Sequence, residues 1–176
     1  YKRQKKLIEK EAYNQVAVRK EEMMDIASRI TGWQKEIAEY RANIQKMENQ
    51  IEALAPWMSL DVPMNFEGTG STRALIGAIS GEMTLEAVYS LIAEYAPEAE
   101  GVDVTVLSAD RDSTYIVALC LKKDAQQVED ALRQGGFAKP SQIVDEVPAV
   151  EKENLEAEIG AVQKQIDTCQ KHIVEY

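Results

Sequence analysis

The fold is decided by residues 26–54, which read IASRITGWQKEIAEYRANIQKMENQIEAL. Apolar residues recur in this stretch at alternating spacings of four and three: Ile26, Ile30, Trp33, Ile37, Tyr40, Ile44, Met47, Ile51 and Leu54. A mean period of 3.5 residues keeps one apolar stripe facing a partner helix, whereas a helix on a globular core shows a broader stripe with period 3.6. The pattern therefore predicts one helix of a coiled coil and requires a partner.

A second stripe of the same kind follows Pro148 and supplies that partner: Leu155, Ile159, Val162, Ile166, Cys169, Ile173 and Tyr176. If the intervening residues close a hairpin, the two helices run antiparallel, with Leu155 near Leu54 and Tyr176 near Trp33. Residues 1–32 are then left without a partner. We expect the parent chain to continue past Tyr176 and cover them, and we expect this third to fray, bend or self-associate on its own.

Pro56 separates the first helix from a different kind of sequence. Residues 1–55 lack Pro, contain only one Gly and are rich in helix-forming residues, so they predict a single helix of about 80 Å. Pro56 cannot continue it. We expect a first coiled-coil helix over 1–56, an α/β lobe with its entry linker over 57–148, and a return helix over 149–176. Trp57, at the junction, is either a packing plug or an exposed partner contact.

The lobe (residues 57–148) shows the periodicity of alternating strands and helices. Strands are predicted at Ala74–Ile79, Val102–Leu107 and Tyr115–Leu121, and helices over Leu85–Tyr95 and from Asp124 to Gly135. Thr84 and Asp124 are predicted N-caps, the latter with Gln127 three residues on, and Gly135-Gly136 is a predicted C-cap. Phe137 is expected to fold back onto the core.

This order predicts an α+β chain: a small ferredoxin-like β-α-β-β-α lobe at the tip of a long antiparallel coiled-coil hairpin. Residues Gln142–Val147 are a candidate fourth strand, although they are short, carry two acids and end at Pro148. The two helices cover only one face of the sheet. Because the third strand is apolar on both faces, the second face needs a cover: the linker of residues 57–68, the end of the coil, or another protein.

The charge of the chain argues against a nucleic-acid partner. The formal net charge is −10 and the pI is about 4.7, whereas binding to a phosphate backbone depends on clustered Lys and Arg. One basic cluster stands at the N-terminus: Lys2, Arg3, Lys5, Lys6 and Lys10. It fits a solvated helix face, with a juxtamembrane or acidic-partner contact as the alternative.

The remaining global features point to a reduced, intracellular piece of a larger protein. Cys120 lies in a predicted strand and Cys169 on a predicted helix, and neither belongs to a metal-binding motif. No run of about 18 apolar residues and no signal peptide is visible, so direct membrane insertion by this piece is not expected. The chain begins at Tyr1 rather than Met, which indicates a fragment.

A search for chemistry predicts no catalytic, cofactor-binding or metal-binding residue. His172 is the only histidine, and it is expected to be exposed on the flank of the second stripe. Gly68 to Arg73 resembles a phosphate loop but lacks the Gly-Lys-Ser/Thr ending and precedes a strand. Asp110 and Asp112 fit a hairpin turn, in which carboxylates bond the backbone.

Several segments together resemble the cytoplasmic part of V-type ATP synthase subunit I, the bacterial and archaeal counterpart of vacuolar ATPase subunit a. They are Glu52-Ala-Leu-Ala-Pro-Trp57, Ser59-Leu-Asp-Val-Pro63, Gly68-Thr69, Thr72-Arg73, the helix Leu85–Tyr95, Arg111-Asp112, Gly136-Phe-Ala138 and Pro140-Ser141. The resemblance covers the lobe and both coil ends.

This resemblance implies a non-catalytic stator component on the cytoplasmic side of the cell membrane. In that family the arm continues into a membrane domain that forms the ion half-channels, and its lobes hold the peripheral-stalk subunits E and G against the torque of the rotor. The piece corresponds to the distal lobe with its coil. It lacks the membrane domain, so ion transport, of H⁺ or Na⁺, would belong to the whole complex.

Two other functions remain open from the sequence. The lobe could be a regulatory domain that binds a small ligand, with the coil as a dimeriser, and thermal-shift screening against nucleotides and amino acids would reveal it. The chain could also be a homodimeric scaffold, which sedimentation at several concentrations would detect.

Overall fold

The computed structural model describes residues 2–175, which form two compact units. One unit consists of the first helix up to Met47 and the last helix from Ala157, and the other is Glu48–Glu156, which contains the whole lobe. Long helices and one small antiparallel sheet make up these units. The predicted α+β class is confirmed.

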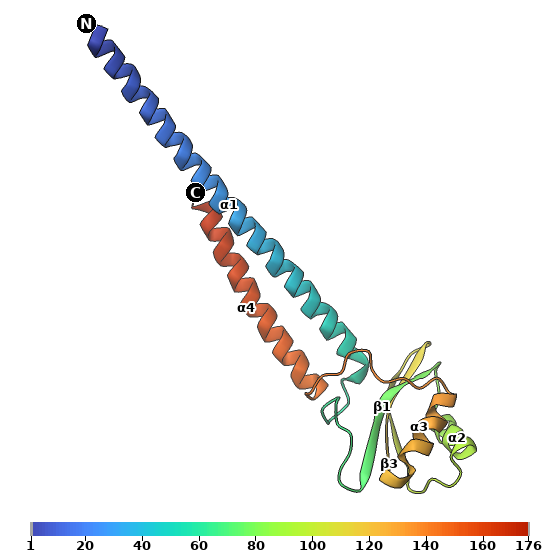
Figure 1. Cartoon of the computed structure of the whole chain (residues 1–176). Helices are drawn as coiled ribbons and strands as arrows, with labels where there is room; N and C mark the ends of the chain where they lie inside the picture. Colours follow the sequence, from blue (N-terminus) through green and yellow to red (C-terminus); the bar gives the residue numbers. More distant parts are fainter. Residues whose placement is uncertain (1, 176) are drawn as a thin grey trace. The chain divides into compact units, whose positions relative to one another are not determined.

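The first unit is an antiparallel helix pair made by α1 (Lys2–Leu54) and α4 (Pro148–Val174), which lie side by side (Figure 1). The ring of Trp33 stacks on that of His172, and the Cys169 thiol donates to Glu36 Oε2 at 3.4 Å. Residue numbers therefore increase along α1 in the direction in which they decrease along α4, so the two helices are antiparallel. The predicted pairing of Trp33 with Tyr176 lies outside the described residues.

The seam of the pair is buried where both helices are present. Its most buried members are Ile37, Ile44, Met47, Ile166 and Cys169. All side chains of residues 2–25 are exposed, including large apolar ones such as Leu7, Ile8 and Val16. This agrees with the prediction that the N-terminal part of α1 lacks a partner helix among the described residues.

The lobe begins where α1 ends. Pro56 converts the chain into a short 3₁₀ turn, η1 (Ala55–Trp57), because it has no N–H to donate to the preceding helical turn. The following elements are β1 (Thr72–Ser80), α2 (Leu85–Tyr95), β2 (Asp103–Ala109), β3 (Ser113–Leu121), η2 (Lys122–Asp124) and α3 (Ala125–Gln134). The three predicted strands are found at the expected positions, but several of the predicted strand ends stop one or two residues short of the observed ends.

The sheet has the strand order β1-β3-β2, with β3 antiparallel to both neighbours. β1 and β2 are thus parallel strands joined by α2 and separated by β3, which is the split β-α-β arrangement that the sequence predicted. Both helices contribute to one apolar core with the sheet: Val88 and Ile92 from α2, Val128 and Leu132 from α3, and Ile79 and Ile116 from the strands. Figure 1 shows both helices on the same side of the sheet.

Backbone caps fix the ends of the two lobe helices. Thr84 Oγ1 accepts from the Ala87 N–H at 3.1 Å, as predicted. At the end of α3 the Phe137 N–H donates to the Leu132 carbonyl and the Gly136 N–H to the Arg133 carbonyl, which is a Schellman motif. Gly136 has φ +83°, a conformation that favours Gly. Phe137 is 7% exposed and joins the core, as expected.

The predicted side-chain cap at Asp124 is wrong. Asp124 precedes α3, but its carboxylate bonds no N–H of that helix. Its Oδ2 instead accepts from the Glu100 N–H at 3.3 Å, which ties η2 to the loop before β2. The 3₁₀ turn η2 leads directly into α3, so Asp124 already has a helical backbone and lacks the extended conformation of an N-cap.

The candidate fourth strand over Gln142–Val147 does not form. Among the described residues, one isolated β-bridge, between Ala78 and Ala138, forms at the outer edge of β1. Continued in that antiparallel register, Pro140 would face Ile76 and would have to donate an N–H to its carbonyl. Proline has no N–H, so the ladder ends after one pair.

The second face of the sheet is covered in part by the linker. Trp57 is 4% exposed, and its ring meets that of Tyr115 edge-on at a centroid distance of 5.1 Å. Ser108 Oγ donates to the Pro56 carbonyl at 2.8 Å, and Ser59 Oγ donates to the Leu107 carbonyl at 3.1 Å. These serines lie at or beside a bulge between Val106 and Ser108 of β2. Trp57 is therefore the packing plug of this junction, not an exposed contact.

Candidate functional site

Within residues 2–175 no group of three His, Cys, Asp or Glu side chains has a geometry that suits a metal ion. No helix in the same range has the length and apolar character needed to cross a bilayer. The candidate side chains His172, Cys120, Cys169 and Asp110 each have a structural role.

His172 is exposed, as predicted, but it is not free in solvent. Its ring lies 5.2 Å from that of Trp33, centroid to centroid, with 16° between the two planes. The stack sits near the last described turn of α4 and joins the two helices of the coil. The histidine thus contributes to helix pairing.

The two cysteines are buried and unpaired. Burial raises the pKa of the Cys120 thiol, with the charge of Asp124 adding to the increase and Arg73 opposing it. The pKa of Cys169 is also raised, first by burial and then by its hydrogen bond to Glu36 and the charge of that carboxylate. Both thiols therefore stay protonated and make poor nucleophiles.

The Cys169–Glu36 contact predicts how the stability of the coil depends on pH. As pH rises, the unfolded chain loses this thiol proton first, because only the folded state raises the pKa. The protonated thiol therefore contributes its full stabilisation of the folded state below the ordinary thiol pKa of 9.0. This contribution is lost as pH rises through the higher pKa of the folded state.

We expect the difference in unfolding free energy between the wild-type chain and Cys169→Ala to shrink between roughly pH 8.5 and 10.5, the range in which thiols titrate. Urea titrations followed by circular dichroism measure this difference. Titration of Lys and Tyr is common to both chains and cancels in the difference. A pH-independent difference would contradict the prediction.

The loop that resembled a phosphate loop and the acidic turn at Asp110 both form hydrogen bonds within themselves. The Thr69 N–H and hydroxyl both bond Thr72, and the Ala74 N–H donates to the Glu67 carbonyl at 2.9 Å. Asp110 Oδ1 accepts from the N–H groups of Asp112 and Ser113 at 2.8 and 2.9 Å. The first loop enters a strand and the second is a hairpin turn, as predicted.

The candidate binding sites of the lobe are surfaces, and the first of them is on β3. On β3, the side chains at 114, 116, 118 and 120 are buried under the helices, while Tyr115, Val117, Leu119 and Leu121 point to the opposite face. We call these four residues the outer face. Trp57 covers Tyr115, whereas Leu119 and Leu121 are each 37% exposed. The outer face therefore keeps an apolar area that the linker does not cover.

A second feature is a groove of about 450 Å³ along the open edge of β1. Linker residues 64–67, residues 73–76 of β1 and the first turns of α3 form its walls, and Phe137, Lys139 and Pro140 close the remaining side. We call this the β1 groove. It occupies the place that a fourth strand would fill.

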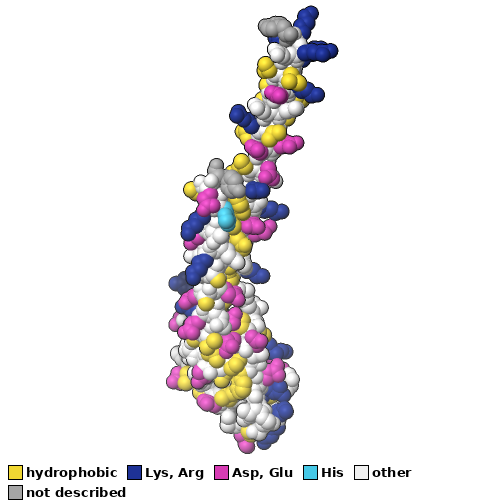
Figure 2. Space-filling view, turned by 90° about the vertical axis from the view of Figure 1, so that its left-hand side faces the viewer, with side chains coloured by type: hydrophobic (Ala, Val, Ile, Leu, Met, Phe, Trp, Pro, Cys, Tyr) yellow, Lys and Arg dark blue, Asp and Glu magenta, His cyan; other side chains and the backbone are white. Residues whose placement is uncertain are grey.

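Sequence reasoning did not find the β1 groove. Its basic residues, Arg73, Lys122 and Lys139, are far apart in the sequence and share no motif. The one usable signal was Pro140, which stands before the candidate fourth strand and prevents it from pairing with β1. Basic side chains also gather at the N-terminal end of α1, as Figure 2 shows.

Comparison with known proteins identifies the fold. No protein-family model matches the sequence, and no curated protein matches it. Among solved structures, the chain is similar to the cytoplasmic N-terminal domain of subunit I, homolog of subunit a, of V-ATPase, with a TM-score of 0.51 and 12% sequence identity. The similarity covers 85% of this chain and 49% of the other, so this chain spans about half the length of the solved structure.

Proposed function

We propose that the chain is a cytoplasmic piece of subunit I of a rotary V-type ATPase or ATP synthase, and that it acts as a non-catalytic stator element beside the membrane. The observation that carries this proposal is the fold similarity over 85% of the chain to the cytoplasmic N-terminal domain of that subunit. The motif resemblance supports the proposal independently, because it depends on the sequence of the lobe and the coil ends and not on the fold.

The two units have properties that suit a stator. In the coil unit, backbone N–H groups beyond the first turn of a helix bond along the helix axis, and the buried seam of Ile37, Ile44 and Ile166 holds the two helices together. Bending such a pair requires both helices to deform together. In the lobe unit, a single core links α2 and α3 to the sheet. A load applied to the lobe surface is thereby shared by all its elements.

We place the docking site for the peripheral-stalk subunits E and G on the outer face. Leu119 and Leu121 give it exposed apolar side chains on a central, well-anchored strand. The cross-strand neighbours of Leu119 are Ala74 and Asp103, one small and one short, so they leave room for a helix to lie across β3. Exposed leucines on the surface of a monomer usually stand singly. Leu119 and Leu121 instead lie on the same face of β3 as Tyr115, which packs against the buried Trp57.

Isothermal titration of the whole chain with an E/G heterodimer tests the proposal. We expect a one-to-one complex, and we expect Leu119→Asp to weaken it by about tenfold or more, because a charge would be buried at the centre of the interface. Leu85→Asp is the matched control, since Leu85 is 38% exposed on α2, away from the outer face. It should leave the affinity unchanged.

Absence of binding by the folded wild-type chain would contradict the stator proposal. If Leu119→Asp and Leu85→Asp weaken binding equally, or neither does, E and G dock elsewhere and the placement on the outer face is wrong. Circular dichroism of each variant verifies that its lobe is folded.

A further inference from the structure

We propose that the β1 groove binds an extended acidic segment of a partner protein, which pairs with the backbone of β1 at Ile76. This goes beyond the stator proposal, because it concerns a different surface from the outer face and a strand-like ligand in place of a helical one. It is carried by the hydrogen-bonding pattern of the strand edge and by the charge of the groove.

Between Ala74 and Ser80, the described structure leaves one outward N–H of β1 without a partner, that of Ile76. The N–H groups of Ala74, Ala78 and Ser80 point away from β3 and donate to the carbonyls of Glu67, Ala138 and Gly135, at 2.9, 2.9 and 3.1 Å. Ile76 lies between the first two and shares their orientation, because alternate residues of a strand face the same neighbour. Among residues 2–175 neither its N–H nor its carbonyl has a hydrogen-bond partner.

This gap is a recognition element for another strand. Ile76 is 7% exposed, and a backbone polar group that is largely buried without a partner is costly. An incoming residue opposite Ile76 would exchange two hydrogen bonds with it, as Ala138 does with Ala78. The chain does not supply this residue itself, because Pro140 would fall opposite Ile76 if the register of the Ala78–Ala138 bridge continued, and proline has no N–H to donate. Strand addition at an open edge is a common mode of peptide recognition.

The charge of the groove selects an acidic ligand. Arg73, Lys122 and Lys139 line it, and among the described residues none of them has a carboxylate within ion-pair distance. Of the two acidic residues in the lining, Glu129 is already paired with Arg133 at 3.1 Å. The groove is therefore net basic, although the chain as a whole is strongly acidic.

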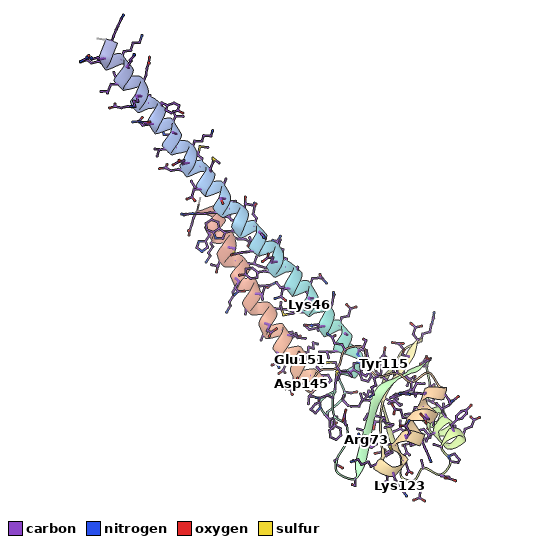
Figure 3. The ribbon with its side chains drawn as sticks, viewed as in Figure 1. Lys46, Arg73, Tyr115, Lys123, Asp145 and Glu151 are labelled. Carbon is purple, nitrogen blue, oxygen red and sulfur yellow. The ribbon has the colours of Figure 1, made fainter. Side chains whose placement is uncertain are left out.

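The size and walls of the groove fit a short stretch of chain. Its volume of about 450 Å³ falls in the range of ordinary ligand sites, roughly 300–1,000 Å³. Met64, Ile76 and Phe137 give it an apolar floor, and Arg73 stands at the start of β1, where Figure 3 labels it. A segment that alternates apolar and acidic side chains matches this arrangement, because successive side chains of a strand point to opposite sides.

The test begins with selection of a phage-displayed library of random octapeptides on the whole, immobilised chain. We expect enrichment of sequences that carry Asp or Glu between apolar residues. The most enriched sequence is then synthesised with a fluorescent label, and its affinity is measured by fluorescence anisotropy. Failure to enrich any sequence, or enrichment of sequences without acidic residues, would overturn the proposal.

Two matched double variants test the site. Lys122→Gln with Lys139→Gln removes two charges from the groove, and Arg111→Gln with Lys123→Gln removes two exposed charges that do not line it. We expect the first pair to weaken binding by about threefold to tenfold, as for two exposed ion pairs, and the second to have less than about a twofold effect. All four side chains are exposed, so both variants should fold. Equal effects would overturn the proposal.

Backbone pairing is tested separately. In amide-resolved NMR, the selected peptide should slow hydrogen exchange at Ile76, and the same peptide N-methylated at its pairing residue should lose this effect together with most of its affinity. An unchanged exchange rate at Ile76 in the saturated complex would show that the peptide binds without joining β1, and the proposal would be wrong.

Discussion

Trp57→Ala is expected to destabilise the lobe by about 3–5 kcal/mol, the usual range for removal of a buried large aromatic side chain. Trp57 is 4% exposed and meets Tyr115 edge-on, so the variant loses apolar burial and an aromatic pair together. The flanking bonds from Ser108 and Ser59 hold the linker and β2 together from both sides and prevent simple collapse onto the gap. Small domains have only about 5–15 kcal/mol of stability, so the loss is a large fraction.

Hydrogen exchange followed by mass spectrometry measures this effect, because peptides from β3 report on the lobe alone. We expect exchange in these peptides to accelerate sharply in Trp57→Ala. Trp33→Ala is the control, since Trp33 belongs to the coil unit, where it stacks on His172. It should loosen α4 and leave β3 unchanged. A β3 segment that exchanges as slowly in Trp57→Ala as in the wild type would contradict the role of Trp57.

Gly77→Ala is expected to cost about 3 kcal/mol, near the upper end of the range for overpacking. A Cβ atom at this position would lie 2.4 Å from the Ala138 carbonyl oxygen and 2.6 Å from two ring carbons of Phe137. The oxygen is a backbone atom that pairs with Ala78, so relief of the clash must break the bridge, move the Phe137 ring, or do both. The substitution thus pushes away the residues that close the β1 groove.

Gly70→Ala is the matched control for this prediction. It makes the same chemical change in the same unit, at a glycine that has no atom within 4 Å of the added Cβ and has no positive φ. Urea unfolding of a Trp33→Phe background, with Trp57 as the remaining fluorophore, should show a lower midpoint for Gly77→Ala alone. Equal midpoints for the two variants would mean that the contact with Ala138 relaxes without cost.

Sequence periodicity predicted the helices and strands because interactions between residues close in the sequence determine where they form. Pro56 ends α1, Thr84 caps α2, and the pair Gly135-Gly136 ends α3, and each of these effects depends on one residue and its near neighbours. The antiparallel pairing of α1 with α4 was also predictable, because two stripes with the same period need each other. The exact ends of the strands were not, since strand ends depend on the partner strand.

The features that sequence reasoning missed all depend on register or on distant neighbours. Pro140 prevents a fourth strand only because it falls opposite Ile76, and that register is set by the bridge at Ala138. Asp124 bonds Glu100, which is remote in sequence, instead of the helix beside it. The β1 groove likewise combines the linker, a strand and a helix. No pattern within one segment contains this information.

The bulge in β2 has a further consequence for the chain at high concentration. β2 is an edge strand, and a straight, open edge can recruit the sheet of another molecule and start aggregation. Between Val106 and Ser108 the ladder slips by one residue, so β2 bends and does not offer a regular row of donors and acceptors. Together with Asp103 at its start, the bulge protects this edge against sheet-to-sheet polymerisation.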